Sequence, residues 1–312
     1  MDTPPKRNAM TFFVITESMA HTSALSSLCA TAAIFLALSL NTAVAQAQSN
    51  SSEHQSDSCM MCDFNDSTLM HDPDALEKTF IAFADRMQRQ SPAEAAADMR
   101  RTAEHLCAIR NERRKELLRQ RLEQYAQRTL GDSTSAEHNA LLHSMFTKIL
   151  NLTYYADMAK RNGNEYMRKN LEKNMPGSPA TDFAFTDRKG KTHTLYKEKA
   201  ALTMLFFYDP DCHVCHEIAG QLAKVSQLTA GDNIKVLSIY TDMETERWKA
   251  HAPDFPKSWI DGYSPDGKIM REELYHLPVI PSIYLLDADK RVLLRDVSPE
   301  TLTEVIKQLA NN

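Results

Sequence analysis

The feature that most constrains this chain is a nearly continuous apolar run, residues 202–208, that leads directly into a Cys-x-x-Cys motif at Cys212 and Cys215. Such a run is typical of a β-strand that is buried on both faces of a sheet. Short β-type runs and helical runs alternate on both sides of it, from residue 175 onward. This alternation indicates βαβ units, an α/β fold and a largely parallel sheet.

The pattern of apolar residues also predicts where these elements lie. Strands are expected at residues 182–186, 192–196, 202–208, 234–240, 282–286 and 292–294. Helices are expected at residues 214–228, 244–251 and 299–309. The cysteine motif would then stand where a buried strand ends and a helix begins.

The preceding segment, residues 74–174, has a different character. It is almost free of Gly and Pro, and its apolar residues recur at helical spacing. Ser91 and Glu94 have the spacing of a capping box, and Gly131 marks a break between helical stretches. We therefore expect an all-α domain, a bundle of about four helices, followed by the α/β domain at 175–312.

The amino-terminal segment predicts export. Residues 28–40 form an apolar stretch of about a dozen residues, which is shorter than the roughly 20 that a membrane-spanning helix needs. Small-residue cleavage patterns follow it and end at Ala45 or Ala47. We expect a cleavable signal peptide at 1–45 and a location in the periplasm of a Gram-negative bacterium. The alternative is an uncleaved anchor, which would be the chain's only contact with a membrane.

Residues 46–73 are rich in Ser, Asp and His and are expected to form a flexible leader. The leader carries a second Cys-x-x-Cys pair, Cys59 and Cys62, for which three roles stay open. These are a local disulfide, a second dithiol that exchanges with the first pair, and a Cu(I) site. Of the other cysteines, Cys29 would be lost with the signal peptide, and Cys107 is interpreted as a small buried hydrophobe.

The charge of the chain bears on its partners. The net charge is −5, so there is no global basic field that would attract nucleic acid. The basic runs alternate with acids and indicate solvated helix faces. We expect no nucleic-acid partner.

The Cys212-His-Val-Cys215 motif suits disulfide exchange, in which a thiolate is the nucleophile. At the start of a helix, unpaired N–H groups and the helix dipole favour the thiolate of Cys212, and Cys215 lies one turn away, within reach of a mixed disulfide. Cys212 is therefore predicted to be the nucleophile and Cys215 the resolving thiol. His213 would support the thiolate and Asp211 would oppose it. Glu217 is either a proton acceptor for Cys215 or a surface acid of the first helical turn.

The same motif has other interpretations. With His216 it also reads Cys-x-x-Cys-His, the pattern for covalent attachment of c-type haem. Zinc bound by the two cysteines with His216 or with the leader pair, and a purely structural disulfide, are further alternatives. The position of the motif between a buried strand and a helix favours redox exchange, and we expect no metal.

Several segments in order resemble the thioredoxin superfamily and, within it, the TlpA-like periplasmic thiol-disulfide oxidoreductases. They are the opening segment Gly177-Ser-Pro179-Ala-Thr-Asp-Phe183, the hairpin Thr186-Asp-Arg-Lys-Gly190-Lys, the strand-Cys-x-x-Cys-helix unit, the segment around Trp248 and Trp259-Ile-Asp-Gly262-Tyr, and His276-Leu-Pro-Val-Ile280-Pro281-Ser-Ile-Tyr-Leu-Leu286-Asp. The resemblance covers about residues 175–312. Two features depart from the family: Asp211 stands where Trp is frequent, and no proline separates the cysteines.

The resemblance implies a thioredoxin-like fold, with a central mixed sheet flanked by helices, after the helical domain. It also implies that the Ile280–Pro281 bond is cis and lies beside the Cys212 sulfur. The backbone of Ile280 would then pair with an extended substrate segment, as in strand addition. An ordinary proline that enters an edge strand is the alternative.

These observations together predict an enzyme, an exported thiol-disulfide oxidoreductase. We expect protein thiols and disulfides as substrates, a separate redox protein as partner, and no cofactor beyond the Cys212–Cys215 disulfide. One alternative is a redox-silent thioredoxin-fold protein that binds a partner through its helical domain, which a very low reduction potential would indicate. Another is a metal- or haem-carrying protein, which bound metal or a Soret band would reveal.

Overall fold

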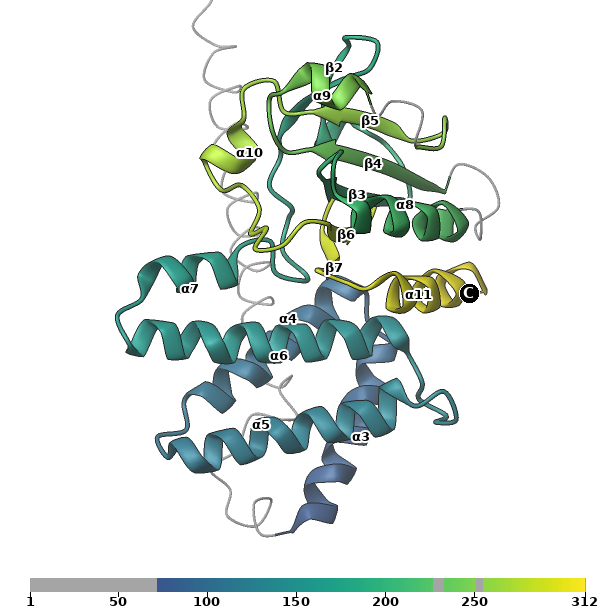
Figure 1. The fold of residues 1–312 in the computed structure, drawn as a ribbon. Coiled ribbons are helices and arrows are strands. Elements are labelled where there is room, and N and C mark those ends of the chain that lie inside the picture. Colours follow the sequence, from purple (N-terminus) through teal and green to yellow (C-terminus); the bar gives the residue numbers. More distant parts are fainter. Residues whose placement is uncertain (1–71, 227–232, 251–254, 312) are drawn as a thin grey trace, which may run out of the picture. The chain divides into compact units, whose positions relative to one another are not determined.

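The computed structural model describes residues 72–226, 233–250 and 255–311 (Figure 1). The signal peptide expected at 1–45, Cys29, and the leader up to residue 71 with Cys59 and Cys62 lie outside the described residues. Within the described ranges, no helix combines the length and the apolar character needed to cross a membrane.

The first part of the described chain is helical. Its elements are α3 (Pro73–Gln88), α4 (Pro92–Cys107), α5 (Glu112–Ala126), the π-helical turn η1 (Gln127–Gly131), α6 (Ala140–Arg161) and α7 (Glu165–Glu172). The expected capping box is present, since the Ser91 side chain accepts from the Glu94 N–H and the Glu94 carboxylate accepts from the Ser91 N–H. The chain breaks at Gly131 as expected. A fifth α-helix, the short α7, was not expected.

The second part is built on a mixed sheet. The strands in the described residues are β1 (Ala184–Asp187), β2 (Thr192–Thr194), β3 (Leu202–Tyr208), β4 (Ile234–Tyr240), β5 (Ile260–Tyr263), β6 (Ser282–Leu286) and β7 (Val292–Arg295). Their order in the sheet is β2-β1-β5-β4-β3-β6-β7. The helical elements are η2 (Leu195–Lys197), α8 (His213–Ser226), α9 (Thr245–Ala250), α10 (Lys268–Arg271) and α11 (Pro299–Asn311).

This topology confirms the predicted fold class, a thioredoxin-like mixed sheet with flanking helices after a helical region. The expectation of a largely parallel sheet was wrong. Only β3–β4 and β4–β5 pair in parallel, and the other neighbours, β1–β2, β1–β5, β3–β6 and β6–β7, are antiparallel. The central strand β3 is buried along nearly its whole length, as its apolar sequence predicts.

Two layers of side chains cover the sheet. Phe207, Leu237 and Tyr284 pack on one face with Ile269 of α10. The other face, which carries Phe206, is covered by α8 and α11, and the apolar cluster there continues into the cores of α3, α4 and α6. The helical region and this face of the sheet therefore share one hydrophobic core.

Candidate active site

Cys212 stands at the turn that joins β3 to α8. Its N–H donates to the carbonyl of Asp209 over 3.1 Å, which closes the turn, and its own carbonyl accepts the N–H of His216 over 3.3 Å. Its sulfur accepts the N–H of Cys215 over 3.2 Å. The thiol thus occupies the place of a helix cap, where it meets a backbone donor that a thiolate would use better than a thiol would.

Cys215 is placed differently, one turn into α8. It is 1% exposed, and both it and Cys212 are free thiols in this structure. Burial, and then the hydrogen bond with Cys212, raise the pKa of Cys215 to about 12. Of the two cysteines, Cys212 is half-buried, whereas Cys215 is fully buried.

An arginine that sequence reasoning missed lies against the acidic residues of the turn. Arg247 on α9 forms ion pairs with Asp211 and, over 2.9 Å, with Asp209. The hydrogen bond with Asp211 is the largest cause of a raised pKa of Arg247. The positive charge of Arg247 therefore offsets the negative charge of Asp211, which was expected to oppose the thiolate of Cys212. The signal was present in the topology: β3 and β4 are parallel, so the segments that follow them meet at one edge of the sheet.

The other expected modulators lie on the first turns of α8. His213 and Glu217 are exposed and approach each other, with 3.5 Å between Nδ1 and Oε1. Glu217 is thus placed as a surface acid, the second of its two interpretations. His216 is tied to the turn instead, since its Nε2 donates to the carbonyl of Pro210 over 2.7 Å. Coordination of haem iron or zinc through Nε2 would break this hydrogen bond.

The predicted cis-proline lies at the same edge of the sheet. The Ile280–Pro281 peptide bond is cis, which confirms the isomer that the resemblance implies. Ser282 pairs with Phe207 in the antiparallel β3–β6 ladder, so continuation of this register brings Pro281 and Ile280 alongside the turn that carries Cys212. The register therefore places Ile280 and Pro281 beside the end of β3, from which the turn with Cys212 departs.

A buried carboxylate supports the strand beneath this turn. Asp261 on β5 accepts hydrogen bonds from the Tyr208 hydroxyl (2.8 Å), the Ser238 hydroxyl (2.8 Å) and the Trp248 indole (3.0 Å), and it pairs with Arg188 at 2.5 Å. Burial raises the pKa of Asp261, and the guanidinium of Arg188 opposes that shift. Since Tyr208 is the last residue of β3, the network fixes the strand end from which the Cys212 turn departs.

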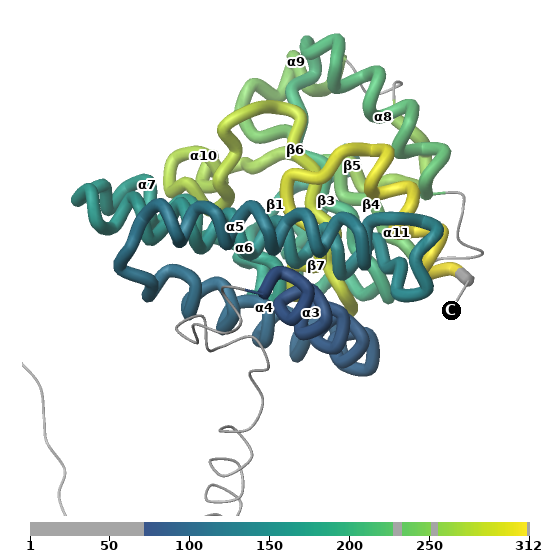
Figure 2. The backbone as a smooth tube through the Cα atoms, turned by 90° about the horizontal axis from the view of Figure 1, so that it is seen from below, coloured from purple at the N-terminus to yellow at the C-terminus, as the bar shows by residue number. Residues whose placement is uncertain are grey.

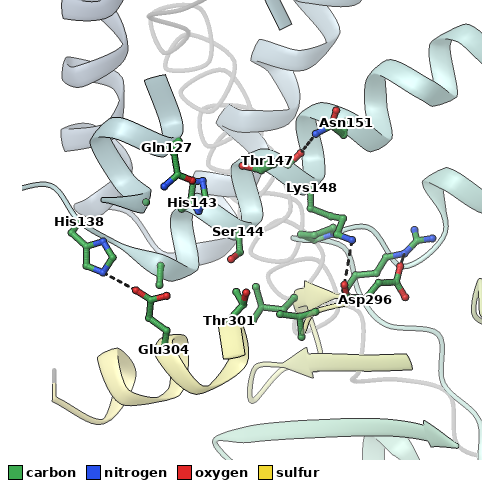
Figure 3. A pocket seen from close by; sticks show the side chains of 16 residues that line it. Gln127, His138, His143, Ser144, Thr147, Lys148, Asn151, Asp296, Thr301 and Glu304 are labelled. Atoms are coloured by element: carbon green, nitrogen blue, oxygen red, sulfur yellow. Dashed lines mark hydrogen bonds and ion pairs between the residues drawn. The ribbon is translucent and has the colours of Figure 1, made fainter. Parts of the chain in front are cut away.

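Neither Cys212 nor Cys215 lines either of two cavities in the described structure. One, of about 500 Å³, opens between α6 and the β7–α11 segment, where His138 pairs with Glu304 (3.2 Å) and Lys148 reaches the Asp296 carbonyl (3.5 Å) (Figure 3). The other, of about 570 Å³, is lined by Cys107, whose pKa burial raises to about 12. Cys107 is half-buried rather than fully buried. The described residues contain no cluster of three or more His, Cys, Asp or Glu side chains suited to a metal ion.

The part of the chain that contains Cys212 and Cys215 is similar to known proteins. Residues 176–293 match the model of the AhpC/TSA family. No curated protein matches the sequence. Similar solved structures include a thioredoxin-like protein from Bacteroides caccae, 27% identical over 78% of this chain and 87% of that one, with a TM-score of 0.48.

Two further structures are similar to the carboxy-terminal part alone. The C-terminal domain of an uncharacterized Bacteroides fragilis protein is 38% identical and covers 45% of this chain and 99% of its own, with a TM-score of 0.41. A thiol-disulfide oxidoreductase from Bacteroides fragilis is 23% identical and covers 42% of this chain and 99% of its own, with a TM-score of 0.39.

Proposed function

Because the carboxy-terminal part of this chain is a thioredoxin-like domain of the AhpC/TSA family, we propose that the protein is an exported thiol-disulfide oxidoreductase. Its substrates are disulfides and thiols of other proteins. The observation that carries the proposal is the contrast between the two thiols: Cys212 caps α8 at the sheet edge, whereas Cys215 is buried one turn below it.

In the reducing direction, the Cys212 thiolate attacks one sulfur of a substrate disulfide. The substrate S–S bond breaks, a mixed disulfide forms on Cys212, and one substrate sulfur leaves as a thiolate. Cys215 then loses its proton and attacks the Cys212 sulfur, which releases the second substrate thiol and forms the Cys212–Cys215 disulfide. Two electrons pass to the substrate, and a dithiol protein must return them. The same steps run in reverse oxidise a substrate dithiol.

The surrounding residues support these steps. Arg247 offsets the charge of Asp209 and Asp211 near the attacking sulfur. The backbone of Ile280, next to the cis-proline, would pair with an extended substrate segment and hold its sulfur opposite Cys212.

We further propose the division that the sequence predicts: a signal peptide at 1–45, a leader at 46–73, a helical domain at 74–174 and a thioredoxin-like domain at 175–312. The apolar stretch and small-residue cleavage pattern of the first segment support a periplasmic location. The bounds of α3 and α7 on one side and of β1 on the other agree with a change of architecture near residue 175.

The proposal is tested by trapping with a disulfide-containing protein such as insulin. Cys215→Ser should accumulate a mixed disulfide, because Cys212 still attacks and nothing resolves the product. Cys212→Ser should neither form the adduct nor reduce the substrate. Cys107→Ser is the matched control and should keep full activity. Substrate reduction by Cys212→Ser at the wild-type rate would rule the mechanism out.

A further inference from the structure

Helix α7 is attached to the loop that leads from α10 to the cis-proline. The Lys173 ammonium donates to the Glu273 carbonyl, the Asn174 amide donates to the Leu274 carbonyl over 2.9 Å, and the Tyr166 hydroxyl donates to the Glu273 carboxylate over 2.7 Å. Figure 1 shows that the loop that follows α10 descends to the carboxyl end of α7, and in Figure 2 α7 and α10 lie on the same side of the molecule. The helical region therefore reaches the same loop that carries the candidate substrate-binding residues.

A buried arginine also holds the carboxyl end of α7. Arg295 on β7 is 2% exposed, and its guanidinium donates to the carbonyls of Asn170, Leu171 and Lys173 over 3.3, 3.0 and 2.6 Å. The last carbonyls of a helix have no partner within the helix, and a cation at that end also complements the helix dipole. Helix α7 is thus fixed to the sheet at its carboxyl end and to the loop along its side.

A cleft of about 170 Å³ opens between α7, α10 and this loop. Its lining is mixed: polar atoms come from Asn170, Glu273 and His276, and apolar surface comes from Tyr166, Met270, Tyr275, Leu277 and Pro278. Tyr166 is 66% exposed and Met270 49%, although both are large side chains. Pro278 belongs to the lining, and the next residue, Val279, is 68% exposed and directly precedes Ile280.

Large apolar side chains that stay exposed beside a cleft are available for contact with a ligand. The size of the cleft is also informative, because an apolar cavity of about 150 Å³ accepts a benzene ring. This cleft therefore has room for one aromatic or large aliphatic side chain. It is continuous along the chain with the cis-proline edge, where an extended substrate would pair.

We propose that α7 and the 270–279 loop bind the segment of the substrate polypeptide that adjoins its reacting cysteine, with an aromatic or large aliphatic side chain in the cleft. This inference rests on the proposed redox function. Under this inference the helical region selects substrates that carry an apolar residue near their disulfide. An extended segment advances about 3.3 Å per residue, so successive positions from the cysteine sample successive places along this surface.

The test is single-turnover oxidation of the reduced full-length protein by short disulfide peptides that carry Phe or Ala at successive positions from the cysteine. Glutathione disulfide serves as a substrate too small to reach the cleft. Tyr166→Ala and Met270→Ala should each raise the half-saturating concentration of the best Phe peptide by about tenfold, since one apolar group in a pocket contributes about that much. The limiting rate, and the rates with Ala peptides and glutathione disulfide, should not change.

Tyr155→Ala is the matched control, because Tyr155 is a partly exposed tyrosine on α6 and is not in the lining of the cleft. Equal half-saturation of Phe and Ala peptides by the wild-type protein would overturn the proposal, as would an unchanged half-saturation in both cleft variants. If the cleft variants changed the oligomeric state but bound the peptides unchanged, the proposal would also be overturned. The surface would then be one that binds a second copy of this chain. Failure of the redox function itself is distinguishable, because glutathione disulfide and every peptide would then be inert.

Discussion

The role of Arg295 leads to a prediction that can be worked through quantitatively. In Arg295→Met the side chain keeps its length and apolar stem but loses its five donors and its charge. Three backbone carbonyls would then lose a charged partner. They are those of Leu171, Lys173 and Asn170, which accept hydrogen bonds of 3.0, 2.6 and 3.3 Å from Arg295.

The expected loss follows from these contacts. A hydrogen bond to a charged group contributes about 1.5–3 kcal/mol, so the two shorter bonds set a range of about 3–6 kcal/mol. Part of this is regained, because water can reach some carbonyls once α7 loosens. We expect the free energy of unfolding to fall by about 3 kcal/mol, which corresponds to a Tm lower by roughly 6–12 °C for a chain of this size.

Urea denaturation followed by circular dichroism and by tryptophan fluorescence measures the change. Both tryptophans, Trp248 and Trp259, lie in the sheet part, so their fluorescence reports on that part separately. Arg291→Met is the matched control. Within the described residues, the Arg291 side chain makes one hydrogen bond, to the Gly177 carbonyl over 3.2 Å, and its loss should cost less than about 1 kcal/mol. A loss for Arg295→Met no larger than for this control would refute the reasoning.

Two further predictions concern the redox thiols. At pH 8 iodoacetamide should modify Cys212 in the reduced protein and leave Cys215 almost untouched. A pKa of about 12 leaves on the order of one Cys215 thiolate in 10⁴ at this pH. Equal modification of both cysteines in peptide mapping would contradict the burial of Cys215. Arg247→Gln removes the cation beside Asp211, and should slow the reaction of Cys212 with a small disulfide about two- to fivefold at low salt and less at high salt. Lys249→Gln on the same helix should leave that rate unchanged.

Local patterns were enough to predict the central part of the site. An apolar strand, a short turn and an amphipathic helix are each encoded by neighbouring residues, so β3, α8 and the position of Cys212 between them follow from the sequence. The cis bond before Pro281 was expected only from resemblance, because few X–Pro bonds are cis and no local pattern specifies which.

Strand β5 was missed because its sequence disfavours a strand. It contains Asp261 and Gly262, two residue types that are depleted in strands. The burial of Asp261 depends on donors from distant segments, and Gly262 is needed because a Cβ there would lie 2.7 Å from the Phe185 ring and 2.9 Å from the Thr186 carbonyl oxygen. Tertiary contacts therefore override the local preference, and a single sequence does not show them.

The shared core gives a physical basis for the proposal that the helical region contributes to substrate binding. One cluster of buried apolar side chains runs from Phe80 and Phe146 in the helices, through Leu294 on β7, to Ile306 on α11 and Cys215 on α8. A helix that leaves such a core has a fixed direction, and the contacts of Arg295 fix its end as well. Binding groups on rigid elements discriminate better than groups on loops. Under our proposal, α7 would therefore select among substrates that backbone pairing with Ile280 alone would accept equally.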